Sequence, residues 1–227
     1  MVKILSLGDC NTLGAGKCEG NAYPERFAMM LGAEICNCGF TMSTTREGGL
    51  FFRDFYDETT SIVTIQYGLV DSWETIAHAP YVLYYPDNIF RRIGRKIVKK
   101  YKKTCRQLGL NTLFKNAYVV PPAQYVRSIN EIIDHCTSST KIFLIETIPN
   151  RDAQRNPAIQ KYNQLLKQIE TSEPRCQLIK IYDYFLENQD SLYADDTHIN
   201  AEGHEFIALQ LLNACKGKGN TRNEQGA

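Results

Sequence analysis

Three residue types that together carry out nucleophilic catalysis lie near opposite ends of the sequence. Cys10 lies in SLGDCNTLG (6–14), directly after an apolar run, whereas Asp195 and His198 lie in YADDTHINAEGH (193–204). On a turn that enters a helix, a carboxylate three residues before a histidine can hold one imidazole nitrogen and leave the other to face a nucleophile. The pattern therefore predicts a Cys-His-Asp triad.

The chemistry of this triad depends on the ionisation and reactivity of the Cys10 thiol. A free cysteine has a pKa of about 8.5, and a neighbouring imidazole or helix N-terminus lowers it, so we expect a Cys10 thiolate at neutral pH, paired with His198. Attack on an ester would give a thioester, which reacts with water or with amine and hydroxyl acceptors. The alternatives are that Cys10 replaces a catalytic serine, or that it is a small buried side chain in a protein that binds without catalysis.

Other polar residues have weaker patterns. His204 is predicted to lie on the surface of the last helix, and the carboxylates of Asp9 and Asp71 are predicted to accept backbone amides at strand ends. The eight cysteines include no CxxC pair, and no Gly-rich nucleotide loop is present, so we expect free thiols, no metal and no cofactor.

Alternating apolar runs and helical patterns must position these residues. The apolar runs that predict buried parallel strands are 2–8, 33–39, 61–68, 141–148 and 176–184. Helical patterns cover 23–31, about 88–108, 123–136, 157–170 and 201–215. This alternation predicts an α/β fold, a three-layer α/β/α sandwich with a five-stranded parallel sheet, as one domain over residues 1–215 with a disordered tail over 216–227.

Three of the predicted strands end in polar, glycine-containing turns. These ends are GDC (8–10), NCG (37–39) and GLVD (68–71). In an open parallel sheet, ligands bind beyond the carboxyl ends of the strands. We therefore expect the three ends to meet at one crevice.

The same segments resemble the conserved blocks of the SGNH/GDSL hydrolase superfamily. The first block (Gly-Asp-Ser-x-x-x-Gly) is similar to GDCNTLG (8–14), with cysteine in the place of serine, and the second is similar to NCGFTMSTT (37–45). The third and last blocks are similar to GLVD (68–71) and DDTH (195–198). The resemblance implies a flavodoxin-like fold and ester hydrolysis. More loosely, GLVDS resembles a GIVD variant associated with bacterial surface-polysaccharide biosynthesis.

The resemblance also implies residue roles. Cys10 would be the nucleophile, His198 the general base and Asp195 the residue that orients it. The backbone amides of Cys10 and Gly39 would bind the oxyanion. Val70 stands where the family carries an Asn whose side chain completes the oxyanion pocket, and loss of such a donor costs about 3–4 kcal/mol. The remaining residues predicted for the oxyanion and substrate site are Asn11, Val70 and Asp71.

These observations favour an ester hydrolase acting on a carbohydrate or another small acyl ester. The same residues could serve an acyltransferase in surface-glycan assembly, or the chain could be a non-catalytic carbohydrate-binding protein of this fold. The expected partner is thus a small-molecule or glycan ester, and the oligomeric state is left open.

The amino-acid composition argues against two other classes of partner. The 26 Lys and Arg against 25 Asp and Glu argue against nucleic acid, and the absence of a long apolar run or leader argues against membrane insertion and for a cytoplasmic location.

The region 88–108 is locally basic. Its Lys and Arg alternate with apolar residues at spacings of three and four, which predicts an amphipathic helix with a basic outer face. That face is either a solvated surface or a docking site for an anionic glycan or lipid carrier. The aromatic-rich segment 72–86 before it is either a lid or a packed loop.

Overall fold

The computed structural model describes residues 1–77, 79–108 and 116–217. Its central sheet has five parallel strands in the order β2-β1-β3-β6-β7, which confirms the predicted sheet. The strands are β1 (Lys3–Gly8), β2 (Glu34–Gly39), β3 (Ile62–Gln66), β6 (Lys141–Ile145) and β7 (Cys176–Ile179).

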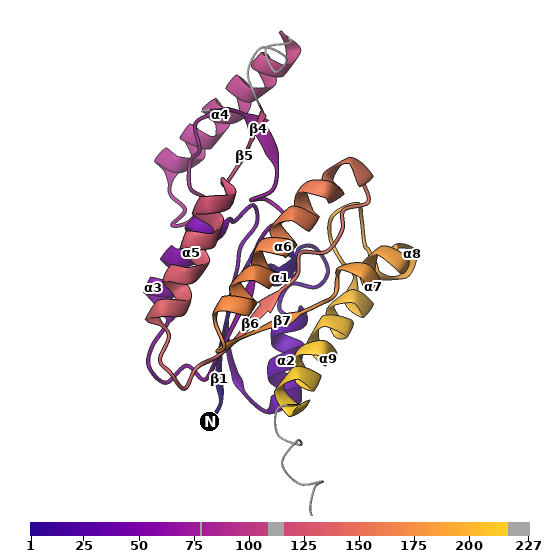
Figure 1. Cartoon of the computed structure of the whole chain (residues 1–227). Helices are drawn as coiled ribbons and strands as arrows, with labels where there is room; N and C mark the ends of the chain where they lie inside the picture. The colour runs from indigo at the N-terminus through magenta and orange to yellow at the C-terminus, as the bar shows by residue number, and fades with distance from the viewer. Residues whose placement is uncertain (78, 109–115, 218–227) are drawn as a thin grey trace, which may run out of the picture.

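Helices cover both faces of this sheet (Figure 1). The helices are α1 (Cys10–Leu13), α2 (Tyr23–Leu31), α3 (Thr45–Phe55), α4 (Ile89–Gln107), α5 (Pro122–His135), α6 (Asn156–Ser172), α7 (Tyr182–Glu187), α8 (Gln189–Leu192) and α9 (Ala201–Gly217), with a 3-10 turn at Ala153–Arg155. Successive residues of a strand point to opposite faces, so Ile4 packs into the core beneath α2 and α9, whereas Leu5 and Leu7 pack into the core beneath α3, α5 and α6.

Two differences from the sequence prediction have a visible physical cause. The run 176–184 was predicted to be one strand, but β7 ends at Ile179 and α7 begins at Tyr182. The Glu146 carboxylate accepts the amides of Ile181 and Tyr182, each at 2.9 Å, and these bonds start the helix. Helix α3 was not predicted, although Thr44 and Glu47 form a capping box at its start.

Helix α4 lies apart from the sheet, beside a small antiparallel pair formed by β4 (Glu74–Ile76) and β5 (Asn116–Tyr118) (Figure 1). The segment between β4 and α4 packs onto α3, because Glu47 accepts hydrogen bonds from the Tyr81 hydroxyl at 2.9 Å and from the Tyr84 amide at 2.8 Å. Within the described ranges, no helix combines the length and apolar character needed to cross a bilayer.

Helix α9 corrects two expectations. It continues to Gly217, so residues 216 and 217 of the predicted tail are helical, and the rest of that tail lies outside the described residues. His204 is 1% exposed rather than on the surface, because it shares the buried face of α9 with Ile207 and Leu211. Its Nδ1 accepts the Tyr23 amide at 3.2 Å, and burial lowers the pKa of His204 to about 4.

Candidate active site

The three polar strand ends meet as expected at one edge of the sheet. Gly8, the last residue of β1, lies opposite Gly39 of β2 and Gln66 of β3. The chain leaves all three strands on this side, and the ligand site of an open parallel sheet lies there. The residues that follow these strands are therefore the candidates for chemistry.

Cys10 is the first residue of α1, directly beyond β1. Asp9 caps this short helix through its Oδ1, which accepts the Asn11 amide at 2.9 Å, and Gly14 ends it with a left-handed φ of 79°. This capping confirms the expected role of the Asp9 carboxylate. Burial raises the pKa of Asp9 to about 7. The apolar neighbours of Cys10 are Leu69, Ile159 and Tyr182.

The ionisation predicted for Cys10 is wrong. Its side chain is 5% exposed, and burial, aided by the nearby Asp9 carboxyl, raises the pKa of Cys10 far above its ordinary value. Among the described residues, no hydrogen bond joins the Cys10 Sγ to His198. Burial disfavours the thiolate more than the backbone N–H groups of Cys10 and Asn11 favour it, so the balance lies toward the neutral thiol. All eight cysteines are free, as predicted.

His198 is held by Asp195 in the geometry that their spacing suggested. The Asp195 Oδ2 lies 2.7 Å from the His198 Nδ1, and its Oδ1 accepts the amides of Thr197 at 2.7 Å and His198 at 2.8 Å. Partial burial raises the pKa of Asp195, but these hydrogen bonds outweigh it, and the net shift is downward. An ionised carboxylate only accepts, so the Nδ1 donates to it and the Nε2 is the ring nitrogen left for another partner.

Asn11 connects the cysteine to the histidine loop. Its Nδ2 donates to the Thr197 carbonyl at 3.1 Å, and its Oδ1 accepts the Ile199 amide at 3.1 Å. These two partners flank His198, so the Asn11 side chain holds the loop on both sides of the imidazole. The expectation that Asn11 serves the oxyanion is thereby corrected, because its amide group is used to position His198.

Gly39 does not present a free amide. Its N–H donates to the Oδ1 of Asn37 at 2.8 Å, so the predicted oxyanion donor is already paired. A Cβ at this position would collide with the backbone of Thr12 and Leu13. The glycine is therefore explained by the close approach of β2 to α1 rather than by contact with an oxyanion.

Met42 is a residue of this region that the sequence did not reveal. Its φ of 63° lies in the left-handed region, which a side chain other than glycine adopts at a cost of about 1–3 kcal/mol. Such strain gathers at functional sites. The turn that holds it is closed by the Ser43 amide, which donates to the Phe40 carbonyl at 3.0 Å, and Met42 lines the same groove as Val70.

Asp71 lies beneath this surface. Its carboxylate is fully buried, and its Oδ1 accepts the amide of Thr45 at 2.9 Å and the hydroxyl of the same residue at 2.7 Å. The predicted bond to a backbone amide is thus present, and the carboxylate has no exposed surface in this structure. Asp71 instead fixes the start of α3, which follows the Met42 turn. Burial raises the pKa of Asp71 to about 6.

A groove of about 1080 Å³ begins at this edge and runs to α4. Aromatic and basic side chains line much of it, and its lining does not include Cys10 or His198. The lining residues that mark its course are Met42, Val70, Trp73, Tyr84, Arg95 and Lys96. Val70 is the predicted site residue that lines this groove, so the groove begins beside the region of Cys10 and His198.

Arg155 is a second residue that no motif indicated. Its Nη2 donates to the Leu69 carbonyl at 2.9 Å, and its guanidinium lies over the Trp73 ring, 4.5 Å from the centroid. The Nε is buried with no hydrogen-bond partner among the described residues. Burial lowers the pKa of Arg155, although the nearby Asp152 carboxylate opposes the shift. A buried guanidinium with an unused donor is suited to a polar or anionic group.

A sequence profile described as the GDSL-like lipase/acylhydrolase family matches residues 6–206. The chain belongs to this family. The GDSL-like match spans all three strand ends and the Asp195–His198 loop, which agrees with the strand order and the position of the crevice described above. No curated protein matches the sequence.

Solved structures share the fold of this GDSL-like chain at low sequence identity. Axe2, an acetylxylan esterase from Geobacillus stearothermophilus, is 16% identical, with a TM-score of 0.62 and 93% of each chain covered. LAE5, an alpha/beta hydrolase from the metagenome of Lake Arreo, is 18% identical, with a TM-score of 0.63 and 94% of each chain covered. A G-D-S-L family lipolytic protein from Veillonella parvula is 13% identical, with a TM-score of 0.61, covering 94% of this chain and 97% of its own.

Axe2 has been solved as several catalytic mutants. The substitutions in these mutants replace a serine, an aspartate, and a histidine three positions after that aspartate. Asp195 and His198 have the same spacing in this chain.

Proposed function

We propose that this GDSL-like protein hydrolyses esters through Cys10, His198 and Asp195. The observation that carries the proposal is the double hydrogen bond of Asn11 to the residues on either side of His198. It ties the imidazole loop to the helix that begins with Cys10. Asp195 bonds the Nδ1, so the Nε2 is the nitrogen available to a nucleophile.

The buried neutral thiol sets the order of the steps. The Cys10 Sγ attacks the ester carbonyl carbon as the His198 Nε2 takes the thiol proton, which forms a C–S bond and an oxyanion. The oxyanion collapses, the C–O bond to the alcohol breaks, and His198 returns the proton to the leaving oxygen. Water, deprotonated by His198, then cleaves the thioester to give the acid and the free thiol.

The backbone amides of Cys10 and Met42 are our candidates for the oxyanion donors. The N–H of Cys10, at the first position of α1, has no acceptor within its helix. Met42 replaces Gly39 in this role, since the Gly39 amide is bonded to Asn37 and Met42 borders the groove at Val70.

The lining of the groove favours a negatively charged carbohydrate ester as the substrate. Trp73 provides a ring on which a sugar can stack, while Lys96 and Lys99 provide positive charge. Its volume of about 1080 Å³ exceeds the need of a small acyl group alone. The acetylxylan esterase Axe2, which has the same fold, acts on a carbohydrate ester, as its name states.

The test measures hydrolysis of 4-nitrophenyl acetate and of acetylated xylo-oligosaccharides. We expect Cys10→Ala and His198→Ala to lower kcat by on the order of 10³-fold or more. Intact-mass spectrometry of quenched wild-type protein should detect the acyl thioester, which Cys10→Ala cannot form. Lys167→Gln, an exposed change on α6, is the matched control. Full activity in Cys10→Ala would refute the proposal.

Two further outcomes separate the mechanisms. Activity in Cys10→Ser would indicate a pocket suited to an oxygen nucleophile, whereas loss in both Cys10 variants would support thiol chemistry. If Cys10 in the wild-type protein resists both iodoacetamide and the ester, a non-catalytic binding role is favoured.

Acyl transfer is a second candidate, favoured by the size of the groove. A thioester is reactive toward a hydroxyl, and the groove has room for an acceptor sugar beside Val70. Product analysis with and without an acceptor oligosaccharide distinguishes the two. A transferred acyl group on the acceptor indicates transfer, and free acid alone indicates hydrolysis.

A further inference from the structure

Helix α4 carries an exposed apolar stripe, defined here as Phe90, Ile97, Tyr101 and Leu108, the last lying just beyond the helix end. These side chains are spaced by seven, four and seven residues, so they share one face. Their exposed fractions are 81%, 63%, 48% and 67%. Large apolar side chains with such exposure in one row are uncommon on a protein surface that remains in water.

The stripe is a local feature of this helix. Of the fourteen exposed large apolar residues among those the structure describes, six lie at positions 89–108. The others are scattered over several elements, as exposed apolar residues normally are. The concentration of exposed apolar side chains on this helix indicates an interaction surface.

The charges of α4 indicate the chemistry of that partner. The helix sequence contains nine Lys and Arg residues and no Asp or Glu. Lys100 and Lys103 are exposed and have no carboxylate within ion-pair distance in the described part of the chain. A second copy of the helix would bring like charges together, so self-association through this face is disfavoured.

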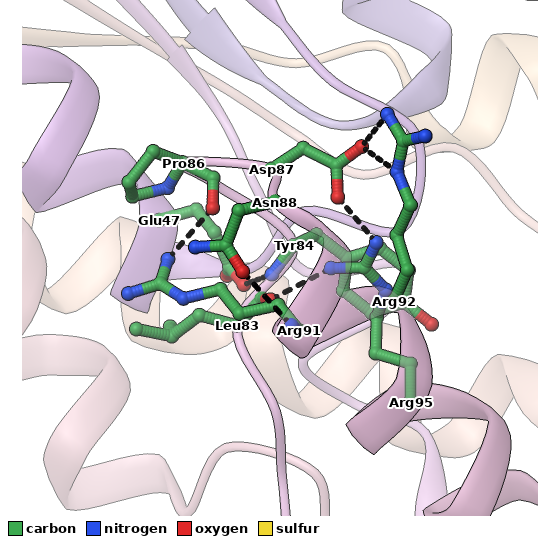
Figure 2. Close-up of polar contacts among 9 residues, drawn as sticks. All are labelled: Glu47, Leu83, Tyr84, Pro86, Asp87, Asn88, Arg91, Arg92 and Arg95. Atoms are coloured by element: carbon green, nitrogen blue, oxygen red, sulfur yellow. Dashed lines mark hydrogen bonds and ion pairs between the residues drawn. The ribbon is translucent and has the colours of Figure 1, made fainter.

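The first turns of the helix are held in place by a separate set of bonds (Figure 2). The Asp87 carboxylate binds Arg92 at 2.7 Å and Arg95 at 2.6 Å, and Asn88 accepts the Arg91 amide at 2.9 Å. The hydrogen bonds from Arg92, and next from Arg95, lower the pKa of Asp87 to about 2. These arginines thus anchor α4 to the preceding loop, and the helix presents its stripe already folded.

We propose that the outer face of α4 docks on an anionic lipid bilayer surface. Interfacial helices of this type place aromatic and aliphatic side chains at the acyl boundary while Lys and Arg bind lipid phosphates. The stripe supplies the first group over about 16 Å from Phe90 to Tyr101, and Lys100 and Lys103 supply the second. A soluble anion would account for the lysines but not for the exposed stripe. The inference is independent of ester hydrolysis.

The test is vesicle co-sedimentation of the full chain without substrate. We expect binding to phosphatidylcholine vesicles that contain phosphatidylglycerol and little binding to phosphatidylcholine alone. Lys100→Gln with Lys103→Gln should weaken binding by about thirtyfold, the effect of removing two cations from an anionic surface. Phe90→Ser with Ile97→Ser should weaken it by at least about tenfold.

Matched controls change equivalent side chains elsewhere. Lys167→Gln with Lys180→Gln removes two exposed charges, and Met29→Ser removes a side chain that is 74% exposed on α2. Both should bind vesicles like the wild type, and thermal unfolding should confirm that every variant is folded.

Several results would overturn the proposal. These are no binding to the anionic vesicles, equal binding to both vesicle types, or equal losses in the stripe variants and the controls. A dimer in light scattering that Phe90→Ser with Ile97→Ser dissolves would assign the face to a second copy. Tighter binding of single-stranded RNA than of vesicles would assign it to nucleic acid.

Discussion

Two buried carboxyls near Cys10 lower the stability of the fold when they ionise, but they hold the nearby helix starts in position. Asp9 and Asp71 are each almost fully buried, and burial raises their pKa values to about 7 and about 6. Each also accepts a backbone amide that starts a helix. Their ionisation at neutral pH is therefore a cost that the fold tolerates in order to fix the turns around Cys10.

This cost predicts the pH dependence of an Asp71→Asn variant. Because the folded pKa of about 6 exceeds the ordinary value of 3.8, the folded protein binds this proton more tightly than the unfolded chain. The stabilising contribution is complete below about pH 4 and is lost as the pH rises through 6. Asn keeps an oxygen for the Thr45 amide and cannot ionise, so we expect Asp71→Asn to raise the free energy of unfolding at pH 8 by on the order of 2 kcal/mol relative to wild type, and by much less at pH 4.

Urea unfolding of both proteins at pH 4, 6 and 8 measures this difference. A variant that is destabilised equally at all three pH values would show that the hydrogen bonds of Asp71, rather than its charge, determine stability. Thr171→Ala, an exposed change on α6 whose hydroxyl bonds only the Lys167 carbonyl, serves as a control for the pH dependence of the rest of the protein.

Some properties of single residues at the site could be predicted from the sequence, and others could not. The Asp195–His198 hydrogen bond was predictable because both residues lie within one turn. The pKa of Cys10 was not, since it depends on Leu69, Ile159 and Tyr182, which are distant in the sequence. Met42 was hidden because a left-handed turn is normally marked by glycine or asparagine.

At the scale of elements, the contact between the end of β2 and α1 governs the position of Cys10. Gly39 leaves no room for a Cβ against Thr12 and Leu13, whereas Gly49, within α3, has no atom within 4 Å of the equivalent position. We therefore expect Gly39→Ala to destabilise the protein by about 1–3 kcal/mol, and Gly49→Ala to stabilise it by up to about 1 kcal/mol.

Thermal unfolding of the two alanine variants tests this contrast. Gly39→Ala should also lower esterase kcat, because displacement of α1 moves the thiol away from His198, while Gly49→Ala should leave kcat unchanged. Unaltered stability in Gly39→Ala would mean that β2 and α1 can separate without cost, and the rigid placement of Cys10 would lose its support.

Elements with strong periodicity were predictable, and those with tertiary causes were not. The parallel strands were identified because burial on both faces makes them continuously apolar. His204 was misplaced although its spacing to Ile207 and Leu211 is that of one helix face, because a polar residue was assumed to face water. The helical end of the run 176–184 arises from Glu146, a contact that no local pattern indicates.

The whole molecule has nearly balanced charge but an uneven distribution of it. The formal net charge is +1, yet nine of the 26 Lys and Arg lie in α4. Lys96 and Lys99 line the groove that begins at Val70, so the positive potential of this helix extends along the route proposed for the substrate. The overall composition concealed this asymmetry, because the compensating acidic residues are on other elements.

This distribution predicts a salt dependence that is specific to anionic substrates. The Debye length falls from about 10 Å at 0.1 M salt to about 3 Å at 1 M, which screens the groove cations from an approaching anion. We expect kcat/KM for 4-acetoxybenzoate to fall several-fold over this range, with little change for its neutral methyl ester. Lys96→Gln with Lys99→Gln should lower the low-salt value for the anion and flatten its salt dependence, whereas Lys167→Gln with Lys180→Gln should not. Equal salt dependence for the two esters would show that the cations of α4 do not attract the substrate. The proposed lipid contact would then be the one role left for these basic residues.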